Sequence, residues 1–254
     1  MPDKPRNTNS SISKTAILNG SVILGTNVTI MDHAIIHDNV IIEDNTFIGP
    51  FSIIGERHHT YYDNPKNYSN SKTVIGKNSL IRSHSVIYAG CSLGENFKSG
   101  HSIIIRENSN FGISCMFGNL CQTDEGVKIG NYVRCHSRIF LTGNMEIGEY
   151  SCLYPGVITT DVRYPPYGEN RTPPRIGSKC IVGAGTLLMA GVSLGDGAFI
   201  GAGSLVASDI PDKVLAKGRP AKKIKLVSEI QIPDLEMQNP LPIDEEMIKN
   251  WPQR

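Results

Sequence analysis

The side chains best suited to chemistry gather in the middle of the chain. His101 is followed by the run Arg106-Glu107-Asn108 and then by Asn119. Histidine exchanges protons near pH 7, so His101 is the first candidate for a general acid or base. Glu107 is the second candidate for a catalytic role, because its carboxylate could orient a histidine or accept a hydrogen bond from a bound ligand. Asn108 and Asn119 are candidate ligand contacts.

Charged and aromatic side chains on either side extend this group. Arg82 and Arg106 carry guanidinium groups, whose geometry matches that of a phosphate. His84 and His136 are further candidate ligand contacts. For His84 a conformational explanation also suffices, because histidine tolerates a left-handed backbone better than most side chains.

The element that must hold these residues is a repeat of six. An aliphatic residue returns at every sixth position through most of the chain, and a small or aliphatic residue follows it four places later. Repeats of this kind build parallel β-helices, in which three hexads make one triangular coil. The repeating aliphatic residues begin at Leu18, Leu24, Ile30, Ile36, Ile42, Ile48 and Ile54 and end with Ile176, Val182, Leu188, Leu194, Ile200 and Val206.

A second column of residues supports the same fold independently. The third residue after the aliphatic position is often asparagine or glycine, for example Asn27, Asn45, Asn78, Gly90 and Gly185. These residue types accept the left-handed backbone conformation that a tight corner needs. We therefore predict an all-β parallel β-helix solenoid of about nine coils.

The repeat is interrupted twice and stops before the C-terminus. Residues 56–72 and 161–175 are polar and rich in turn formers, so we expect two extended loops. The predicted divisions are a polar N-terminal segment at 1–16, the β-helix domain at 17–211 and a C-terminal extension at 212–254. The stretch DEEMIKNW near the end is expected to form a helix that caps the solenoid.

Composition narrows the class of protein. Of the 254 residues, 39% are hydrophobic and the net charge is +1, which argues against a nucleic-acid or membrane-surface protein. The apolar runs are too short to span a membrane, and the polar start does not resemble a signal sequence. Five of the six cysteines fall in inward columns, and Cys152 does not. We expect a cytoplasmic protein with reduced thiols and no metal.

The motifs resemble a known family over about residues 18 to 225. The hexads, the turns at 183–185 and 200–204, and the terminal LAKGRPAKKI are similar to the left-handed β-helix acyltransferases of the hexapeptide-repeat class. IRSHSVIYAG at 81–90, FKSGHSIIIREN at 97–108 and TTDVRYPP at 159–166 resemble the subgroup that N-acylates nucleotide-linked amino sugars, such as dTDP-amino-deoxysugar N-acetyltransferases. The left-handed crossover is implied by this resemblance.

The resemblance implies an acyl-CoA co-substrate, such as acetyl-CoA, and a homotrimer with active sites between subunits. Its acceptor would be a dTDP- or UDP-linked amino-deoxysugar, and its products would feed surface glycans such as the O-antigen. By the same analogy, the pantetheine arm of the donor would lie near Ala184 and Ala202. Lys217, Arg219 and Lys222 would serve the phosphates of CoA.

Other functions on the same fold stay open. An O-acetyltransferase of a simple sugar or serine is one alternative. A γ-carbonic-anhydrase-like metal hydrase is another, because 35 residues separate His101 and His136, but its second histidine is replaced by Leu141. A non-catalytic scaffold is a third. The sequence does not decide between a 3-amino and a 4-amino sugar, between dTDP and UDP, or between acyl chain lengths.

Overall fold

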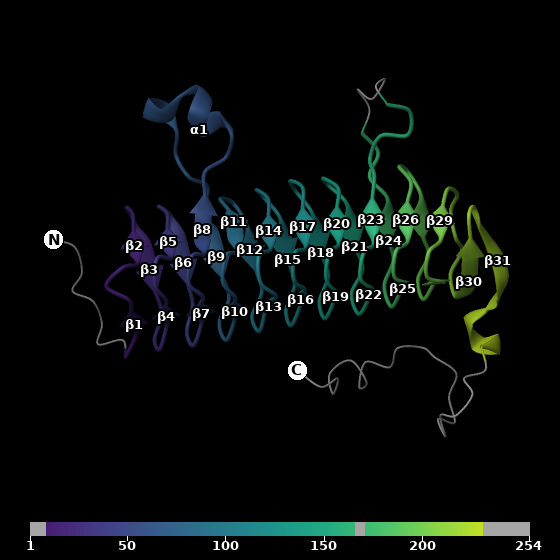
Figure 1. Ribbon diagram of the computed structural model, residues 1–254, viewed down its shortest axis with the longest axis horizontal. Helices are drawn as coiled ribbons and strands as arrows, with labels where there is room; N and C mark the ends of the chain where they lie inside the picture. Colours follow the sequence, from purple (N-terminus) through teal and green to yellow (C-terminus); the bar gives the residue numbers. More distant parts are fainter. Residues whose placement is uncertain (1–8, 166–170, 231–254) are drawn as a thin grey trace.

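The predicted solenoid is present in the computed structural model, which describes residues 9–165 and 171–230 (Figure 1). Three sheets run along its length and form its three sides. Sheet A contains β1 (Ser11–Ile12), β4 (Thr29–Ile30), β7 (Phe47–Ile48), β10 (Leu80–Ile81), β13 (Lys98–Ser99), β16 (Met116–Phe117), β19 (Arg134–Cys135), β22 (Cys152–Leu153), β25 (Ile181–Val182), β28 (Phe199–Ile200), β30 (Val214–Gly218) and β31 (Ala221–Leu226). Sheet B contains β2 (Ile17–Leu18), β5 (Ile35–Ile36), β8 (Ile53–Glu56), β11 (Val86–Tyr88), β14 (Ile104–Ile105), β17 (Gln122–Thr123), β20 (Phe140–Leu141), β23 (Ile158–Thr159), β26 (Leu187–Leu188) and β29 (Leu205–Val206). Sheet C contains β3 (Val22–Leu24), β6 (Val40–Ile42), β9 (Thr73–Ile75), β12 (Ser92–Leu93), β15 (Asn110–Phe111), β18 (Lys128–Ile129), β21 (Glu146–Ile147), β24 (Arg175–Ile176) and β27 (Ser193–Leu194).

The register of the sheets confirms three hexads to a turn. Paired residues in neighbouring turns are 18 positions apart, as Ser92 and Asn110 are. The fold is the all-β parallel β-helix expected for left-handed hexapeptide repeats, with about 11 turns. That is more than the nine coils counted from the sequence, because β1 precedes the first aliphatic residue of the count and β30 follows the last one.

Burial and backbone angles confirm both predicted columns. Ile36 and Val28, one from each inward column, are each fully buried. The corner column has positive φ angles, including 57° at Asn45 and 59° at His84. The asparagines also bond along the solenoid, since Nδ2 of Asn27 donates to Oδ1 of Asn45 over 3.0 Å. The six-residue period therefore sets both the interior and the turns.

Both predicted loops leave the solenoid between a sheet B strand and a sheet C strand, and they project from the same side (Figure 1). The first separates β8 from β9 and contains α1 (Thr60–Asp63) and the 3-10 turn η1 (Pro65–Asn67). The second separates β23 from β24, and residues 166–170 of it lie outside the described part.

The C-terminal end of the solenoid carries a hairpin. Strand β30 continues sheet A in parallel with β28, and β31 turns back antiparallel to it before the 3-10 turn η2 (Val227–Glu229). Strand β1 lies within the predicted segment 1–16, so the first turn starts earlier than the boundary drawn at residue 17. The expected helix in DEEMIKNW lies outside the described residues. Within the described part, no helix has the length and apolar character needed to cross a membrane.

The outer surfaces of the three sheets differ in chemistry. The outward residues of sheet B are almost all apolar, and among them Ile17 is 51% and Ile158 47% exposed. The outward residues of sheet C become polar over most of its length, as at Asn110, Lys128 and Glu146. Sheet A also presents apolar residues outward, among them Phe47, Leu80 and Met116. In a single chain, the apolar outer surfaces of sheets A and B therefore face water.

Candidate functional site

One edge of the solenoid brings together most of the residues predicted to be functional. This A–B edge consists of the four-residue corners that join each sheet A strand to the next sheet B strand, such as residues 100–103. Equivalent positions in successive turns stack above one another because the backbones are bonded from turn to turn. The second position of the corner is occupied, turn after turn, by Ser83, His101, Asn119, Ser137, Pro155, Ala184 and Ala202.

His101 is exposed and held in a defined orientation. Its Nδ1 lies 2.8 Å from Oγ of Ser83 in the preceding turn, and its backbone N–H donates to Oδ1 of Asn119 in the next turn over 2.7 Å. A Cβ on Gly100 would collide with the backbone nitrogen of Asn119, so the close stacking requires glycine there. This arrangement uses Nδ1 of His101 and leaves Nε2 as the nitrogen that can exchange a proton with a ligand.

A basic hollow of about 220 Å³ lies beside this edge, on the outer surface of sheet A. The charged residues that line it are Arg82, Lys98 and Arg134, and no carboxylate is among the described residues that line it. Burial, together with the charge of Arg134, lowers the pKa of His136 at the hollow's margin. The hollow thus offers cationic donors of the kind that bind phosphate.

His136 itself is neutral near pH 7 and stacked. Its ring lies parallel to that of Tyr154, with 4.8 Å between the centroids. Its Nε2 is buried and has no hydrogen-bond partner within the described part of the chain. A buried polar atom without a partner is costly, so this nitrogen is a natural contact for a ligand. The side chain predicted as a ligand contact therefore lies at the hollow.

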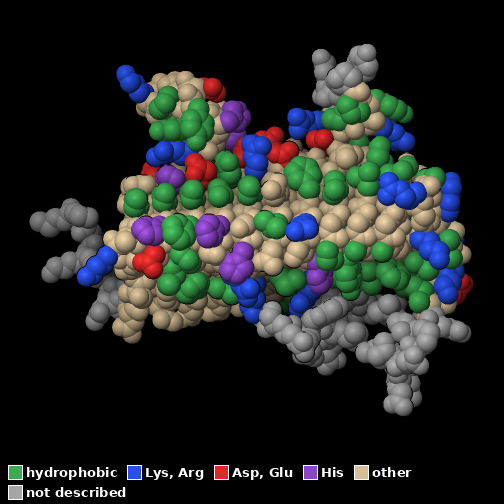
Figure 2. Space-filling view, viewed as in Figure 1, with side chains coloured by type: hydrophobic (Ala, Val, Ile, Leu, Met, Phe, Trp, Pro, Cys, Tyr) green, Lys and Arg blue, Asp and Glu red, His purple; other side chains and the backbone are tan. Residues whose placement is uncertain are grey.

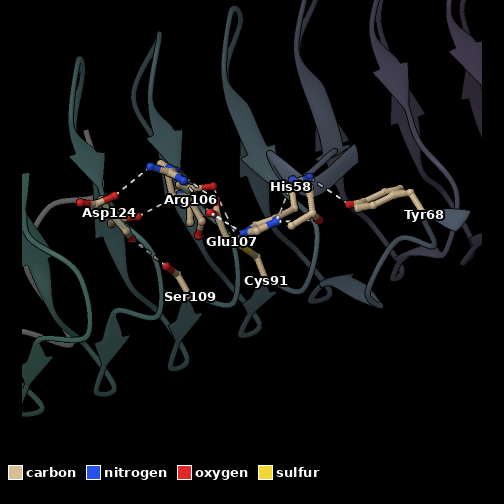
Figure 3. A network of polar contacts seen from close by, with 10 residues as sticks. His58, Tyr68, Cys91, Arg106, Glu107, Ser109 and Asp124 are labelled. Carbon is tan, nitrogen blue, oxygen red and sulfur yellow. Dashed lines mark hydrogen bonds and ion pairs between the residues drawn. The ribbon is translucent and has the colours of Figure 1, made fainter. Parts of the chain in front are cut away.

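Arg106, Glu107 and Asn108 lie on a different edge, between sheets B and C, from which the loops emerge elsewhere along the solenoid. Figure 3 shows Arg106 and Glu107 at this edge. Glu107 has a side chain only 2% exposed, and its Oε1 and Oε2 accept bonds from Arg106 over 2.5 and 3.0 Å. The same guanidinium donates to Asp124 over 3.0 Å. Each nitrogen of Arg106 therefore faces a carboxylate of its own chain, which neutralises the cation that was predicted to hold a phosphate.

Glu107 orients a histidine, but within one chain that histidine is not His101. Its Oε1 lies 3.2 Å from Nε2 of His58, which comes from the first loop. Burial alone would raise the pKa of Glu107, but the bonds from Arg106 outweigh it and hold this pKa below its usual value. His101 and Glu107, the two residues predicted to be catalytic, lie on separate edges because their corners are successive in one turn.

His58 is the residue that sequence reasoning missed. Its backbone N–H donates to the Tyr68 hydroxyl over 2.9 Å (Figure 3). Its Nδ1 lies 2.9 Å from Oγ1 of Thr60. Figure 2 shows the charged side chains gathered between the two projecting loops. The sequence does contain a signal for this residue, because two adjacent histidines lie at the start of the first loop. The six-residue repeat does not extend into the loop, so it could not predict where their side chains lie.

Two predicted contacts have structural roles of their own. His84 adopts a φ of 59° and stacks on Phe51 with 5.2 Å between ring centroids. Asn108 adopts a φ of 58° at the B–C corner, and its Oδ1 fills the space beside Gly90. The corner geometry accounts for both residue types without a ligand.

The residues proposed for CoA lie together at the C-terminal end of the A–B edge. Ala184 and Ala202 are exposed one turn apart, and Gly203 N–H donates to the Ala184 carbonyl over 2.7 Å. Arg219 reaches the Gly203 carbonyl at 3.4 Å. Lys217 and Lys222 pair across the terminal hairpin, and both are exposed. The exposed alanines of this edge are thus followed, at the C-terminal end of the solenoid, by three cationic side chains.

The cysteines are not candidate nucleophiles. All six are free thiols and buried. Burial raises the pKa of Cys91 and of Cys115 to about 12, and the pKa of Cys152 to about 11. Since the thiolate is the nucleophilic form, these side chains are inert core residues near neutral pH.

A wider depression of about 790 Å³ runs over the outer surface of sheet C. The charged side chains that line it are Lys128, Glu146 and Arg175. They pair with one another, at 3.3 Å for Lys128 and Glu146 and 2.5 Å for Arg175 and Glu146. The three charges of this depression therefore satisfy one another.

Comparison with known proteins connects the repeats to a described family. Residues 21–56 and 173–208 match the family model "Bacterial transferase hexapeptide (six repeats)". Among curated proteins, the bifunctional protein GlmU of Alkalilimnicola ehrlichii is 31% identical over 150 residues, which are 59% of this chain and 31% of that protein. GlmU of Mycolicibacterium smegmatis is 33% identical over 147 residues, which are 57% of this chain and 28% of that protein. The chain thus spans about a third of the length of such relatives.

Solved structures with the same general shape are more distant in sequence. An Arabidopsis UDP-N-acetylglucosamine acyltransferase aligns with a TM-score of 0.48 and 14% identity, covering 87% of this chain and 73% of that one. A UDP-N-acetylglucosamine O-acyltransferase from Moraxella catarrhalis aligns with a TM-score of 0.45 and 23% identity, covering 85% and 74%. The match to the family model by itself shows that the chain carries bacterial transferase hexapeptide repeats at residues 21–56 and 173–208.

Proposed function

We propose that this chain is a CoA-dependent N-acyltransferase. It would move an acetyl or larger acyl group from acyl-CoA to the amino group of a dTDP- or UDP-linked amino-deoxysugar. The observation that carries the proposal is the A–B edge, where His101 and Asn119 share one column with Ala184 and Ala202. Four turns separate His101 from Ala184, or roughly 19 Å at the usual strand spacing.

The transferase repeats and the motif resemblance support the acyl-transfer class. A donor lying along the exposed alanines would have its phosphates beside Lys217, Arg219 and Lys222, and its thioester would point toward His101. The small side chains permit a close approach of the pantetheine arm to the backbone.

The chemistry asked of His101 is modest. A sugar amine titrates near an α-amino group, at about 8, so part of it is already neutral at cellular pH. The amine lone pair bonds to the thioester carbon, and the carbon–sulfur bond then breaks. Nε2 of His101 accepts the proton that the ammonium loses and returns it to the departing thiolate. Asn119 offers its Nδ2 to the substrate, because its Oδ1 is taken by His101.

The acceptor would bind in the basic hollow. Arg82, Lys98 and Arg134 present cations to the two phosphates of a nucleotide-linked sugar. Nε2 of His136 is available to bond a polar group of the sugar. These contacts would select a substrate with a diphosphate over a simple sugar or serine.

The apolar outer surfaces of sheets A and B support the proposed homotrimer. Burying them against two further copies would leave the polar surface of sheet C in water and would place the hollow on sheet A beside a neighbour. The active sites would then lie between subunits. The substrates and the six free thiols are consistent with the cytoplasm.

The test is thiol release from acetyl-CoA with a panel of dTDP- and UDP-linked 3-amino and 4-amino sugars. Turnover on one of them is expected, with a loss of roughly 10²-fold or more in His101→Asn. His33→Asn, an exposed histidine on the same edge, is the matched control and should retain wild-type rates. Absence of turnover with every sugar, with acetyl-CoA and with longer acyl donors, would overturn the proposal and favour an O-acetyltransferase of a simpler acceptor.

A further inference from the structure

Three side chains with metal-binding atoms meet at the base of the first loop. They are His58 and His59, which precede α1, and Glu107 at the B–C corner after β14. Their ligand atoms all lie within 4.8 Å of one another. Nothing in the proposed acyl transfer uses them, because the A–B edge lies elsewhere on the solenoid.

The distances suit a small divalent transition ion. Zinc binds imidazole nitrogen and carboxylate oxygen at about 2.0–2.2 Å, which at tetrahedral angles places the ligand atoms roughly 3.3 Å apart. Nε2 of His58 and Oε1 of Glu107 are 3.2 Å apart. His59 is exposed, and its ring lies 3.9 Å from that of His58 between centroids, tilted by 44°, so its ligand nitrogen is already within 4.8 Å of the other two ligand atoms.

The surroundings of these ligands are those of a supported metal site. Oγ1 of Thr60 lies 2.9 Å from Nδ1 of His58 and can accept the proton of that nitrogen when Nε2 coordinates. The Tyr68 hydroxyl fixes the His58 backbone over 2.9 Å. Nε of Arg106 holds the other oxygen of Glu107 over 3.0 Å (Figure 3).

The ion would replace one existing contact. Arg106 now donates to Oε1 of Glu107 over 2.5 Å, and metal coordination of that oxygen would displace this single bond. The guanidinium keeps its bonds to Oε2 of Glu107 and to Asp124.

We propose that His58, His59 and Glu107 form a site for one divalent transition-metal ion, with Zn²⁺ as the probe. Three protein ligands leave the fourth tetrahedral position to water or to a ligand. The ion joins the loop to the solenoid, because two ligands come from the loop and one from the corner of a coil. This site does not depend on the proposed acyl transfer.

The experiment is titration of the full-length, chelator-treated protein with ZnCl₂ by calorimetry. Wild type is expected to bind one ion per chain. His58→Gln and His59→Gln should each weaken binding at least tenfold, and the exposed His33→Asn should not. Because both substitutions lie in a loop, the solenoid is expected to stay folded, which circular dichroism checks. Absence of binding, or equal binding by wild type and the two loop variants, overturns the proposal.

A second measurement reports on the loop directly. Zn²⁺ is expected to slow proteolytic cleavage within residues 57–72 of wild type and to leave the cleavage of His58→Gln unchanged. Equal protection of both proteins by Zn²⁺ would contradict a site built on His58. Co²⁺ in place of Zn²⁺ should give the visible absorption of a four-coordinate ion, which an adventitious surface ion does not give.

Discussion

Nδ1 of His101 lies 2.8 Å from the hydroxyl of Ser83, which occupies the same corner position one turn earlier. The contact fixes the orientation of the imidazole and commits the opposite nitrogen to the ligand side. Ser83 is therefore a positioning residue for the proposed proton transfer, and not a participant in it.

Ser83→Ala should lower kcat about 2- to 13-fold, which corresponds to a neutral hydrogen bond of about 0.5–1.5 kcal/mol. The KM for acyl-CoA should stay unchanged, because the serine is distant from the alanines at the other end of the edge. Steady-state kinetics with both substrates measure the split, and Ser92→Ala on the outer surface of sheet C is the control. A loss as large as that of His101→Asn would show that Ser83 does more than orient the ring.

The donor path can be tested at Ala202, which is exposed and has Gly203 beside it. Tyrosine at this position would cover the small-residue surface on which the pantetheine arm is proposed to lie. Ala202→Tyr should raise the KM for acyl-CoA roughly tenfold, or about 1.4 kcal/mol of binding. The KM for the amino sugar should not change.

The control for this substitution is Ser193→Tyr, which adds the same bulk to the exposed surface of sheet C. It should leave both KM values as in wild type. If Ala202→Tyr behaved like this control, the proposed path of the donor would be wrong, whereas the assignment of His101 would be unaffected.

The corners of the solenoid make a separate prediction about stability. Asn45 has a φ of 57°, and its side chain bonds both Asn27 and Asn78, over 3.0 and 3.1 Å. Asn45→Gly and Asn45→Ala both lose these bonds, but only alanine carries a Cβ into the left-handed region. Asn45→Ala should therefore be the less stable of the two, by roughly 1 kcal/mol.

Urea unfolding of the two variants at one fixed protein concentration measures this difference. Equal stability would mean that the corner tolerates a Cβ without strain. A greater loss in the glycine variant would show that chain entropy outweighs the left-handed strain at this corner.

Much of this architecture follows from the period of six. His101 and Asn119 are 18 positions apart, as are Ala184 and Ala202, so their stacking on one edge is predictable from numbering alone. The cluster of His58 and Glu107 was not predictable, because the loop has no period. The paired strands β8 and β11 are 33 positions apart, and the extra residues follow no repeat that could place His58.

The separation of His101 from Glu107 has the same origin. Both lie in one coil, but a triangular coil carries successive corners to different edges. The two candidate catalytic residues are close in the sequence, but the coil geometry puts them on the A–B and B–C edges. The polarity of each outer sheet surface could also be predicted from the sequence, because the residue before each inward aliphatic residue points outward.

His136 gives a prediction about pH. Burial, and after it the charge of Arg134, lowers the pKa of this histidine in the folded protein. In the unfolded chain the imidazole takes up a proton below about 6.5. The unfolded state therefore binds more protons as the pH falls below that value, and the stability that neutral His136 contributes at pH 7 is lost toward pH 5.

His136→Gln removes this proton uptake, so its melting temperature should fall less between pH 7 and pH 5 than that of wild type. The absolute stability at pH 7 is not the readout, because glutamine also alters the stacking on Tyr154. Burial also lowers the pKa of His37, so part of the acid sensitivity should remain. The exposed His33→Asn should follow the wild-type curve, and a His136→Gln curve parallel to wild type would show that His136 does not carry this pH dependence.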